Sequence, residues 1–372
     1  MDPQTVFCPN LDCPARGQVG QGNIGIHTRK EGRYICHQCH KTFSARKGTP
    51  YYRLRTAEVQ VTLVLTLLAY GCPVAAIVAA FQLDERTVYD WQQRAGQHCE
   101  QLHEHLVQQP RDLGHVQIDE IRVKQQGQIV WLAMALQVVT RLWLGATLSA
   151  HRDESLLTQL VQKVRRCALC RALLVCVDGW RGYPGILRHV FREAIPTRGQ
   201  GRPRLRQWDG LVIAQVVKQY ERGHVIGIVQ RVVEGTLAQV TALLQQSHGG
   251  QVINTAYIER LNATFRQRLA GLIRRGRGLT KQMGTLQRGV YLVGSCYNFC
   301  TFHRSLRVKL LVGSRGRTHC VPRTPAMAAG ITDHRWTMHE VLSYHIPPPR
   351  WTPPKQRGRP SKERKALIQK WA

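Results

Sequence analysis

The sequence predicts a multi-domain protein of the α/β class (α+β multi-domain), and three observations carry this prediction. Two pairs of cysteines lie near the N-terminus, three short helical patterns follow them, and the middle of the chain alternates strand-like and helix-like runs. The chain has 372 residues, which is enough for two or three domains. We expect its parts in this order: 1–50, 51–110, 111–310, 311–345 and 346–372.

The charge balance indicates a polyanionic partner. The chain holds 53 Lys and Arg against 23 Asp and Glu, a formal net charge of +30. Because an excess of this size most often accompanies nucleic acid, we expect double-stranded DNA as the partner. No apolar run approaches the ~18–20 residues of a membrane span, and the first residues carry no signal-peptide pattern. We therefore expect a cytoplasmic, nucleoid-associated protein.

The N-terminal cysteines are spaced as metal ligands. Cys8 and Cys13 form one pair, Cys36 and Cys39 form another, and a glycine-rich stretch separates them. Two such pairs can supply four soft ligands to one tetrahedral Zn²⁺. A domain of roughly 45 residues buries too little apolar surface to fold without such a staple. The pattern predicts a zinc ribbon in 1–50 with one structural ion; four unrelated buried thiols are the alternative.

A helix-turn-helix is predicted in 51–110. Helical patterns cover 56–70, 74–81 and 85–95, with Asp84 placed to cap the third helix. Val88, Trp91 and Ala95 share one face of that helix and should point inward. The outward side chains suited to DNA bases and phosphates are Arg86, Thr87, Gln93 and Arg94. A plain helical bundle is the alternative.

The central segment predicts a sheet whose edge carries two carboxylates. Three strand-like runs at 115–123, 128–139 and 141–148 form an antiparallel meander. A helix over 153–166 then leads to the apolar strand 172–178, which should be a buried parallel strand. Asp119 on the first strand and Asp178 at the end of the fourth should therefore lie side by side.

A third carboxylate, Glu259, comes from a helix over 254–266. The apolar stripe of that helix packs on the sheet and leaves Glu259, Asn262 and Arg266 on a neighbouring polar face. Three clustered carboxylates repel one another, and oxygen ligands suit Mg²⁺ or Mn²⁺, so we expect two such ions. The alternative gives each acid an ordinary role as an ion pair, a turn residue or a surface charge.

These segments together resemble a known family, the DDE transposases of bacterial insertion sequences, in the subgroup with an N-terminal zinc ribbon and helix-turn-helix. The resemblance rests on these segments: Gln117–Glu120, Val177–Gly179 with Tyr183, Asn254–Arg266, Tyr297–Leu306 and Thr324–Gly330. It implies an RNase H-like catalytic core in 111–310. It also implies that Asp119, Asp178 and Glu259 bind the metal ions and that the protein acts as a homodimer or higher oligomer.

By the same resemblance, the chain would cleave phosphodiesters at transposon ends and join the strands to target DNA. Asn262, Arg266 and His303 would support the metal ligands or contact DNA. Two other functions remain open from the sequence. One is a structure-specific nuclease of the same fold that only hydrolyses DNA. The other is a DNA-binding regulator that descends from a transposase and has no catalytic activity.

Three further segments are basic or strand-like. Two strand-like runs, 211–218 and 225–233, predict an inserted hairpin at about 200–235 that contacts DNA or a partner subunit, or that simply extends the sheet. Arg274, Arg275 and Arg277 predict a phosphate-binding loop, with a solvated turn as the alternative.

The tail from Ile346 is rich in proline and basic residues. Arg357 and Arg359 lie in an Arg-Gly-Arg-Pro sequence that resembles an AT-hook, a short segment that inserts arginines into the minor groove. A generic polybasic tail is the alternative. The low hydrophobicity of 346–372 predicts disorder until DNA is bound.

Overall fold

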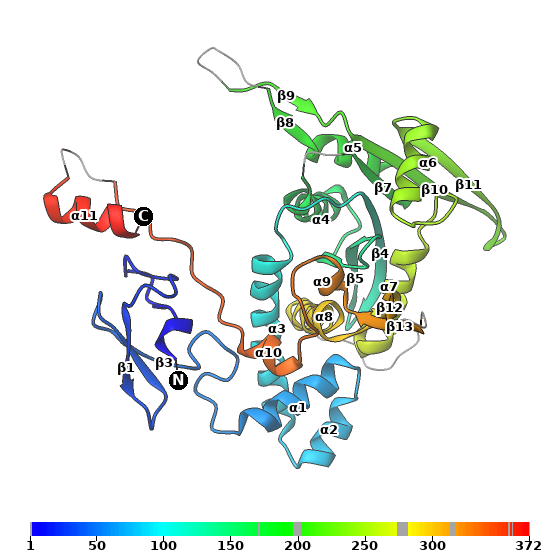
Figure 1. Cartoon of the computed structure of the whole chain (residues 1–372). Helices are drawn as coiled ribbons and strands as arrows, with labels where there is room; N and C mark the ends of the chain where they lie inside the picture. The colour runs from blue at the N-terminus through cyan, green and yellow to red at the C-terminus, as the bar shows by residue number, and fades with distance from the viewer. Residues whose placement is uncertain are drawn as a thin grey trace. The chain divides into compact units, whose positions relative to one another are not determined.

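The computed structural model describes residues 2–169, 172–195, 202–273, 282–312, 317–355, 358 and 360–371. The chain forms two compact units. One consists of Met1–Val61 together with Leu342–Ala372, and the other of Thr62–Val341 (Figure 1). Among the described residues, no helix combines the length and the apolar character that crossing a membrane requires.

The smaller unit contains a three-stranded antiparallel sheet. It starts with the short 3-10 helix η1 (Pro3–Thr5), and its strands are β1 (Ile24–Thr28), β2 (Arg33–Cys36) and β3 (Thr42–Ser44). Tyr34 and Phe43 stack across β2 and β3 with ring centroids 5.7 Å apart. Cys36 ends β2, and Cys39 lies in the turn that leads to β3.

The C-terminal segment completes the core of this unit. Helix α11 (Lys362–Trp371) buries Trp371 to 2% exposure in one cluster with Cys8, Tyr34 and Phe43. The side chain of Gln18 donates a hydrogen bond to the Trp371 carbonyl (3.0 Å). The prediction that 346–372 is disordered without DNA is therefore wrong for α11. The apolar side chains of this helix bury the surface that a small ribbon cannot cover alone.

The predicted helix-turn-helix segment forms the three expected helices, α1 (Glu58–Ala69), α2 (Val74–Phe81) and α3 (Glu85–Leu106). Asp84 caps α3 by accepting a hydrogen bond from the Arg86 amide (2.8 Å). Val88, Trp91 and Ala95 are buried, as the pattern predicts. Helix α3 continues beyond the predicted end at residue 95. Its second half packs on α8 (Met283–Ser295), where Glu100 pairs with Arg288, so α2 and α3 belong to the larger unit.

A six-stranded mixed sheet organises the larger unit (Figure 1). Its strand order is β11-β10-β7-β4-β5-β6. Strand β7 is parallel to both β4 and β10, and the other pairs are antiparallel. The bounds are β4 (His115–Gln125), β5 (Gln128–Gln137), β6 (Trp143–Ser149), β7 (Leu173–Asp178), β10 (Leu211–Glu221) and β11 (His224–Glu234). The predicted meander and the buried parallel strand are thus both present.

The predicted hairpin between Asp178 and Glu259 extends the main sheet. Strands β10 and β11 form an antiparallel hairpin, and β10 pairs in parallel with β7 from Leu211↔Leu173 to Val216↔Asp178. The inner half of β10 is buried, whereas the part after Val217 is exposed. The hairpin therefore extends the sheet, and its contact with DNA or a partner subunit stays a prediction.

Helices cover both faces of the sheet. Helices α4 (Glu154–Cys167) and α5 (Gly182–Val190) pack on one face, and α6 (Leu237–Gln246) and α7 (Ala256–Arg268) pack on the other. Asp153 caps α4 through the Leu156 amide (2.9 Å). The remaining elements are β8 (Arg192–Ala194), β9 (Leu205–Gln207), η2 (Ala270–Leu272), η3 (Cys296–Cys300), β12 (His303–Val312), β13 (Arg317–Arg323), α9 (Pro325–Ala328) and α10 (Met338–Ser343).

Candidate active site

Strand register brings the first two predicted acids together. On the neighbouring parallel strands β4 and β7, Gln117 pairs with Cys176. Each of these residues lies two positions before an acid, Asp119 or Asp178, and residues two apart in a strand share a face. The two carboxylates therefore lie next to each other on adjacent strands, as the sequence predicts.

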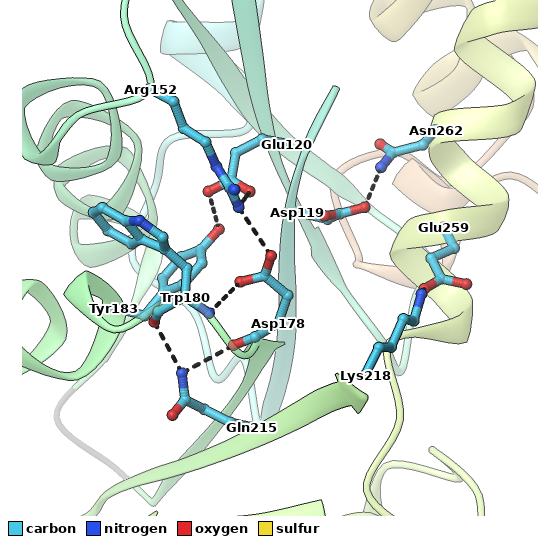
Figure 2. A network of polar contacts seen from close by, with 10 residues as sticks. All are labelled: Asp119, Glu120, Arg152, Asp178, Trp180, Tyr183, Gln215, Lys218, Glu259 and Asn262. Atoms are coloured by element: carbon cyan, nitrogen blue, oxygen red, sulfur yellow. Dashed lines mark hydrogen bonds and ion pairs between the residues drawn. The ribbon is translucent and has the colours of Figure 1, made fainter. Parts of the chain in front are cut away.

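Glu120 joins this pair. One carboxylate oxygen from each of Asp119, Glu120 and Asp178 lies within 4.8 Å of the others. These acids line a cavity of about 540 Å³ together with Glu259 from α7 (Figure 2). All three predicted catalytic acids therefore border the same cavity. The tightest group of oxygens, however, includes Glu120 in place of Glu259.

Two basic side chains stand among these acids. The Arg152 Nη2 atom lies 3.0 Å from Glu120 Oε2 and 2.9 Å from Asp178 Oδ2. Glu259 is turned toward Lys218, whose Nζ donates to its Oε1 at 3.0 Å, and the Thr255 hydroxyl donates to the same oxygen at 3.1 Å. The protein thus supplies a cation to each side of the acidic cavity (Figure 2).

Asp119 is held by helix α7. The Asn262 Nδ2 atom donates a hydrogen bond to Asp119 Oδ2 at 2.7 Å. Asn262 is only 1% exposed, and its Oδ1 accepts no hydrogen bond within the described part of the chain. Glu120 points to the other face of the sheet, where the Tyr183 hydroxyl of α5 donates to its Oε1 at 2.7 Å.

Gln117 fixes the position of α7 over β4. Its side-chain oxygen accepts hydrogen bonds from the backbone amides of Tyr257 and Ile258, both at 3.0 Å. Its Nε2 donates to the Asn254 carbonyl at 2.8 Å. A buried side chain from the sheet thus caps the N-terminus of α7, where amides otherwise lack partners. This contact fixes where along β4 the helix begins, and therefore where Asn262 and Glu259 lie relative to Asp119.

The turn after Asp178 is braced by the β10–β11 hairpin. The Gln215 Nε2 atom donates to the carbonyl oxygens of Asp178 (2.9 Å) and Trp180 (3.1 Å). Arg231 of β11 donates in turn to Gln215 Oε1 (2.6 and 3.0 Å). The Trp180 amide donates to Asp178 Oδ1 at 3.0 Å. The hairpin therefore has a structural role in orienting Asp178.

The electrostatics of the cavity favour a bound cation. Burial, and then the charge of Glu120, raise the pKa of Asp119 to about 7. Burial and the charge of Asp178 also raise the pKa of Glu120. A divalent cation would relieve both effects. The donors are carboxylate oxygens, and Asn262 Oδ1 is a further amide oxygen, which is the chemistry that Mg²⁺ or Mn²⁺ prefers.

The four predicted zinc ligands also lie together. Their sulfur atoms are all within 4.8 Å of one another. The Cys8–Cys39 and Cys13–Cys36 sulfur distances are 3.7 and 3.8 Å. Tetrahedral Zn²⁺ with Zn–S bonds of ~2.3 Å needs sulfur atoms about 3.8 Å apart, so the group could bind zinc. Burial raises the pKa of Cys13 to about 12, and a cation is what would ionise this thiol at neutral pH.

The predicted DNA-contacting residues occupy varied positions. Arg86 is exposed, Thr87 and Gln93 are half-buried, and Arg94 pairs with Asp90 at 2.8 Å. Arg266 lines the acidic cavity, and His303 lies half-buried at the start of β12. The other five, Arg274, Arg275, Arg277, Arg357 and Arg359, lie outside the described residues.

Sequence reasoning missed Glu120, Arg152 and Lys218. Strand alternation assigns Glu120 to the face opposite Asp119, so its sequence position gave no sign of a shared cluster. Arg152 stands directly before the cap of α4, and Lys218 lies on β10, where only the parallel register with β7 reveals the nearby acids. Neither Lys218 nor Arg152 belongs to a spacing or periodicity pattern that would have revealed its role from the sequence.

No model of a known protein family matches this chain, and no curated protein is similar to it in sequence. The fold and the geometry of the carboxylate and cysteine clusters are therefore the observations from which a function can be inferred.

Proposed function

We propose that this protein is a DNA transposase that binds transposon ends and catalyses Mg²⁺-dependent cleavage and strand transfer. One observation carries the proposal: Asp119, Asp178 and Glu259 border one cavity, although they are far apart in the sequence. The net charge of +30 supports a polyanionic substrate. An antiparallel meander followed by the parallel strand β7, with helices on both faces, supports an RNase H-like core.

The metal ligands in this proposal are Asp119, Asp178 and Glu259, with Glu120 close enough to add a fourth carboxylate. Bound Mg²⁺ would activate a water or a 3′-hydroxyl and stabilise the leaving oxygen at phosphorus. The chain's own residues prepare this site. Asn262 orients the Asp119 carboxylate, and Gln117 holds α7 at the height where Glu259 faces the cavity.

Arg152 and Lys218 have two successive roles in this mechanism. Before metal binds, each neutralises carboxylates, because Arg152 pairs with Glu120 and Asp178 and Lys218 pairs with Glu259. If Glu120, Asp178 and Glu259 held a metal ion, the Arg152 and Lys218 side chains would no longer be needed to neutralise them. Both remain at the rim of the cavity, where a guanidinium and an ammonium can contact the phosphates of an incoming strand.

The remaining parts would bind and organise DNA. We assign one structural zinc ion to Cys8, Cys13, Cys36 and Cys39, and DNA contacts to the helix-turn-helix and to the basic tail. Two or more copies would act together, because two transposon ends must be cut and joined. This assembly is the homodimer or higher oligomer that the family resemblance implies.

A strand-transfer assay tests the proposal. The substrate is a labelled duplex that carries the DNA flanking this gene, incubated with Mg²⁺ and a supercoiled plasmid. We expect nicking at a fixed position and joining of the label to the plasmid, and both should be lost in Asp178→Asn. Glu221→Gln, which changes an exposed acid at the end of β10, is the matched control and should be active.

Two outcomes would contradict the proposal. Cleavage without any joining would assign the protein to the nucleases that only hydrolyse DNA. Unchanged DNA binding and unchanged cellular function in Asp119→Ala would assign it to the non-catalytic regulators.

A further inference from the structure

Helix α7 borders a second cavity on its opposite face. With 3.6 residues per turn, Glu259, Asn262 and Arg266 lie on one side of the helix and face the acidic cavity. Arg260, Thr264 and Arg268 lie on the other side and line a cavity of about 750 Å³. The two cavities are therefore separated by a single helix, whose diameter with side chains is about 10–12 Å.

This second cavity is basic, and its described lining contains no acid. Four arginines reach it, from the turn before β6, from α7 and from the start of β12: Arg141, Arg260, Arg268 and Arg304. Within the described part of the chain, none of the four forms an ion pair with a carboxylate. Their charge is thus available to a ligand. This differs from Arg152 and Lys218, whose charges are already balanced.

Aromatic rings, rather than carboxylates, support two of these arginines. The Arg141 guanidinium lies 3.8 Å from the Tyr257 ring centroid, and that of Arg268 lies 4.7 Å from the Tyr70 ring centroid. Tyr70 reaches the cavity because the turn at Gly71 approaches α7 closely; a Cβ there would lie 3.0 Å from the Arg268 backbone. Stacking on a ring face holds a guanidinium in place without neutralising it.

The neutral groups of the cavity suit a base. Phe302 is 41% exposed next to His303, and the Arg335 guanidinium lies 4.9 Å from its ring centroid, as a cation would lie beside a stacked base. Burial, and then the charges of Arg141, Arg260 and Arg268, lower the pKa of His303 to about 4. Its imidazole is therefore neutral at physiological pH and provides one hydrogen-bond donor and one acceptor.

We propose that the cavity between α7 and β12 binds a single unpaired nucleotide of the DNA strand whose neighbouring phosphodiester enters the acidic cavity. The arginines would bind its phosphate, and Phe302 would stack on its base. This inference rests on the proposed function and specifies that the DNA substrate carries an unpaired nucleotide next to the cleaved phosphodiester. A basic groove combined with exposed aromatic rings is the usual way to hold single-stranded DNA. A duplex cannot enter such a cavity, so the base must leave the stack.

The volume favours a nucleotide over a small inorganic anion. Pockets for small organic ligands span roughly 300–1,000 Å³, and this cavity falls within that range. The one-helix separation of the cavities also matches a short stretch of strand that wraps around α7.

Binding of a duplex with a three-nucleotide single-stranded overhang, compared with its blunt counterpart, tests the inference. The measurement uses the full-length chain, a fluorescent label and a buffer without Mg²⁺ or Mn²⁺, so that no cleavage occurs and structural zinc is retained. We expect the wild type to prefer the overhang about tenfold. The double variant Arg260→Ala/Arg304→Ala should lose this preference, because both side chains are exposed and line the cavity. Arg307→Ala, an exposed arginine of β12 outside the cavity, is the matched control and should retain it.

A competition experiment distinguishes a site for a nucleotide from a site for any small anion. Deoxyadenosine monophosphate should displace the overhang at a concentration at least tenfold lower than inorganic phosphate does. Equal competition by the two would overturn the nucleotide assignment and leave an anion site. A double variant that weakens overhang and blunt duplex equally would overturn the site altogether.

The failure of this inference is distinguishable from failure of the proposed function. If Asp178→Asn abolishes joining in the wild-type background while Arg260→Ala/Arg304→Ala keeps the overhang preference, only the nucleotide site is wrong. If the overhang preference depends on Arg260 and Arg304 but no Mg²⁺-dependent chemistry occurs, the nucleotide site stands and the transposase proposal falls.

Discussion

The two faces of helix α7 border cavities of opposite charge, one acidic and one basic. On one face, burial and neighbouring acids raise the pKa of Asp119 to about 7. On the other face, burial and neighbouring arginines lower the pKa of His303 to about 4. Each cavity gathers groups of like charge, and each shifts the pKa of a titratable member toward its neutral form.

The two cavities differ in how their charge is compensated. The acidic cavity contains its own cations, since Arg152 and Lys218 pair with its carboxylates. The guanidiniums of the basic cavity instead lie on tyrosine rings. Under the proposed function, the acidic face would exchange one cation for another. The basic face would receive an anion that the protein does not supply. Both depend on α7, and this dependence makes the comparison testable.

Removing a metal ligand should have the largest effect, and only on the acidic face. Asp178→Asn and Glu259→Gln should each lower the rate of DNA cleavage by more than about 100-fold, because losing a ligand should exceed the 10–100-fold effect of losing a residue that only supports one. Overhang binding should persist in both variants. The measurements are single-turnover cleavage and fluorescence binding.

Glu120→Gln separates the role of the clustered acid from that of Glu259. It should mainly reduce stability, by about 1–3 kcal/mol, because the Tyr183 hydroxyl and Arg152 would lose a charged partner. Denaturant unfolding measures this loss. An inactive but stable Glu120→Gln protein, together with an active Glu259→Gln protein, would move the third ligand to Glu120.

Removing the cap of α7 should disturb both faces at once. Gln117→Leu leaves the Tyr257 and Ile258 amides without their acceptor, and we expect a loss of about 2–3 kcal/mol in the free energy of unfolding. Cleavage and the overhang preference should fall together. Gln251→Leu, at an exposed position before the helix, is the control. A variant that loses cleavage but keeps overhang binding would show that α7 does not couple the two cavities.

Removing the internal cation of the acidic face should strengthen metal binding. In Arg152→Ala, Mg²⁺ no longer competes with a guanidinium for Glu120 and Asp178, so its apparent Kd should fall several-fold. The rise of the melting temperature with Mg²⁺ concentration measures this Kd. Weaker binding in the variant would mean that Arg152 orients the carboxylates instead of competing for them.

The smallest net effect in the wild type is on the pH dependence of stability without metal, because two contributions of opposite sign overlap. Asp119 binds a proton more tightly in the folded state, so its contribution to the free energy of unfolding falls as pH rises from about 4 to 7. His303 binds a proton more weakly in the folded state, so its contribution is present above about 6.5 and is lost as pH falls toward 4. Each slope is at most about 1.4 kcal/mol per pH unit.

The two slopes therefore oppose each other in the wild type between about pH 4 and 6.5. Relative to wild type, Asp119→Asn should gain stability as pH rises through this window, and His303→Gln should lose it. Urea unfolding at several pH values measures both. Parallel curves for wild type and the two variants would contradict the electrostatic comparison.

Local pattern predicted much of this architecture. The cysteine pairs, the three helices around Asp84 and the strand–helix order up to Asp178 all follow from spacing and periodicity, because these signals act over a few residues. The parallel placement of β4 and β7 also predicted that Asp119 and Asp178 meet. The sequence by itself therefore determined the elements and the two ligand clusters in outline.

Tertiary structure alone decided how these elements are used. The Gln117 cap on α7, the Arg152 pair with Asp178 and the Lys218 pair with Glu259 join residues more than 25 positions apart. The burial of Trp371 in the ribbon core joins opposite ends of the chain. The basic cavity likewise collects arginines from three separate segments. Such contacts depend on side-chain direction and on packing between distant segments, and no local periodicity encodes either one.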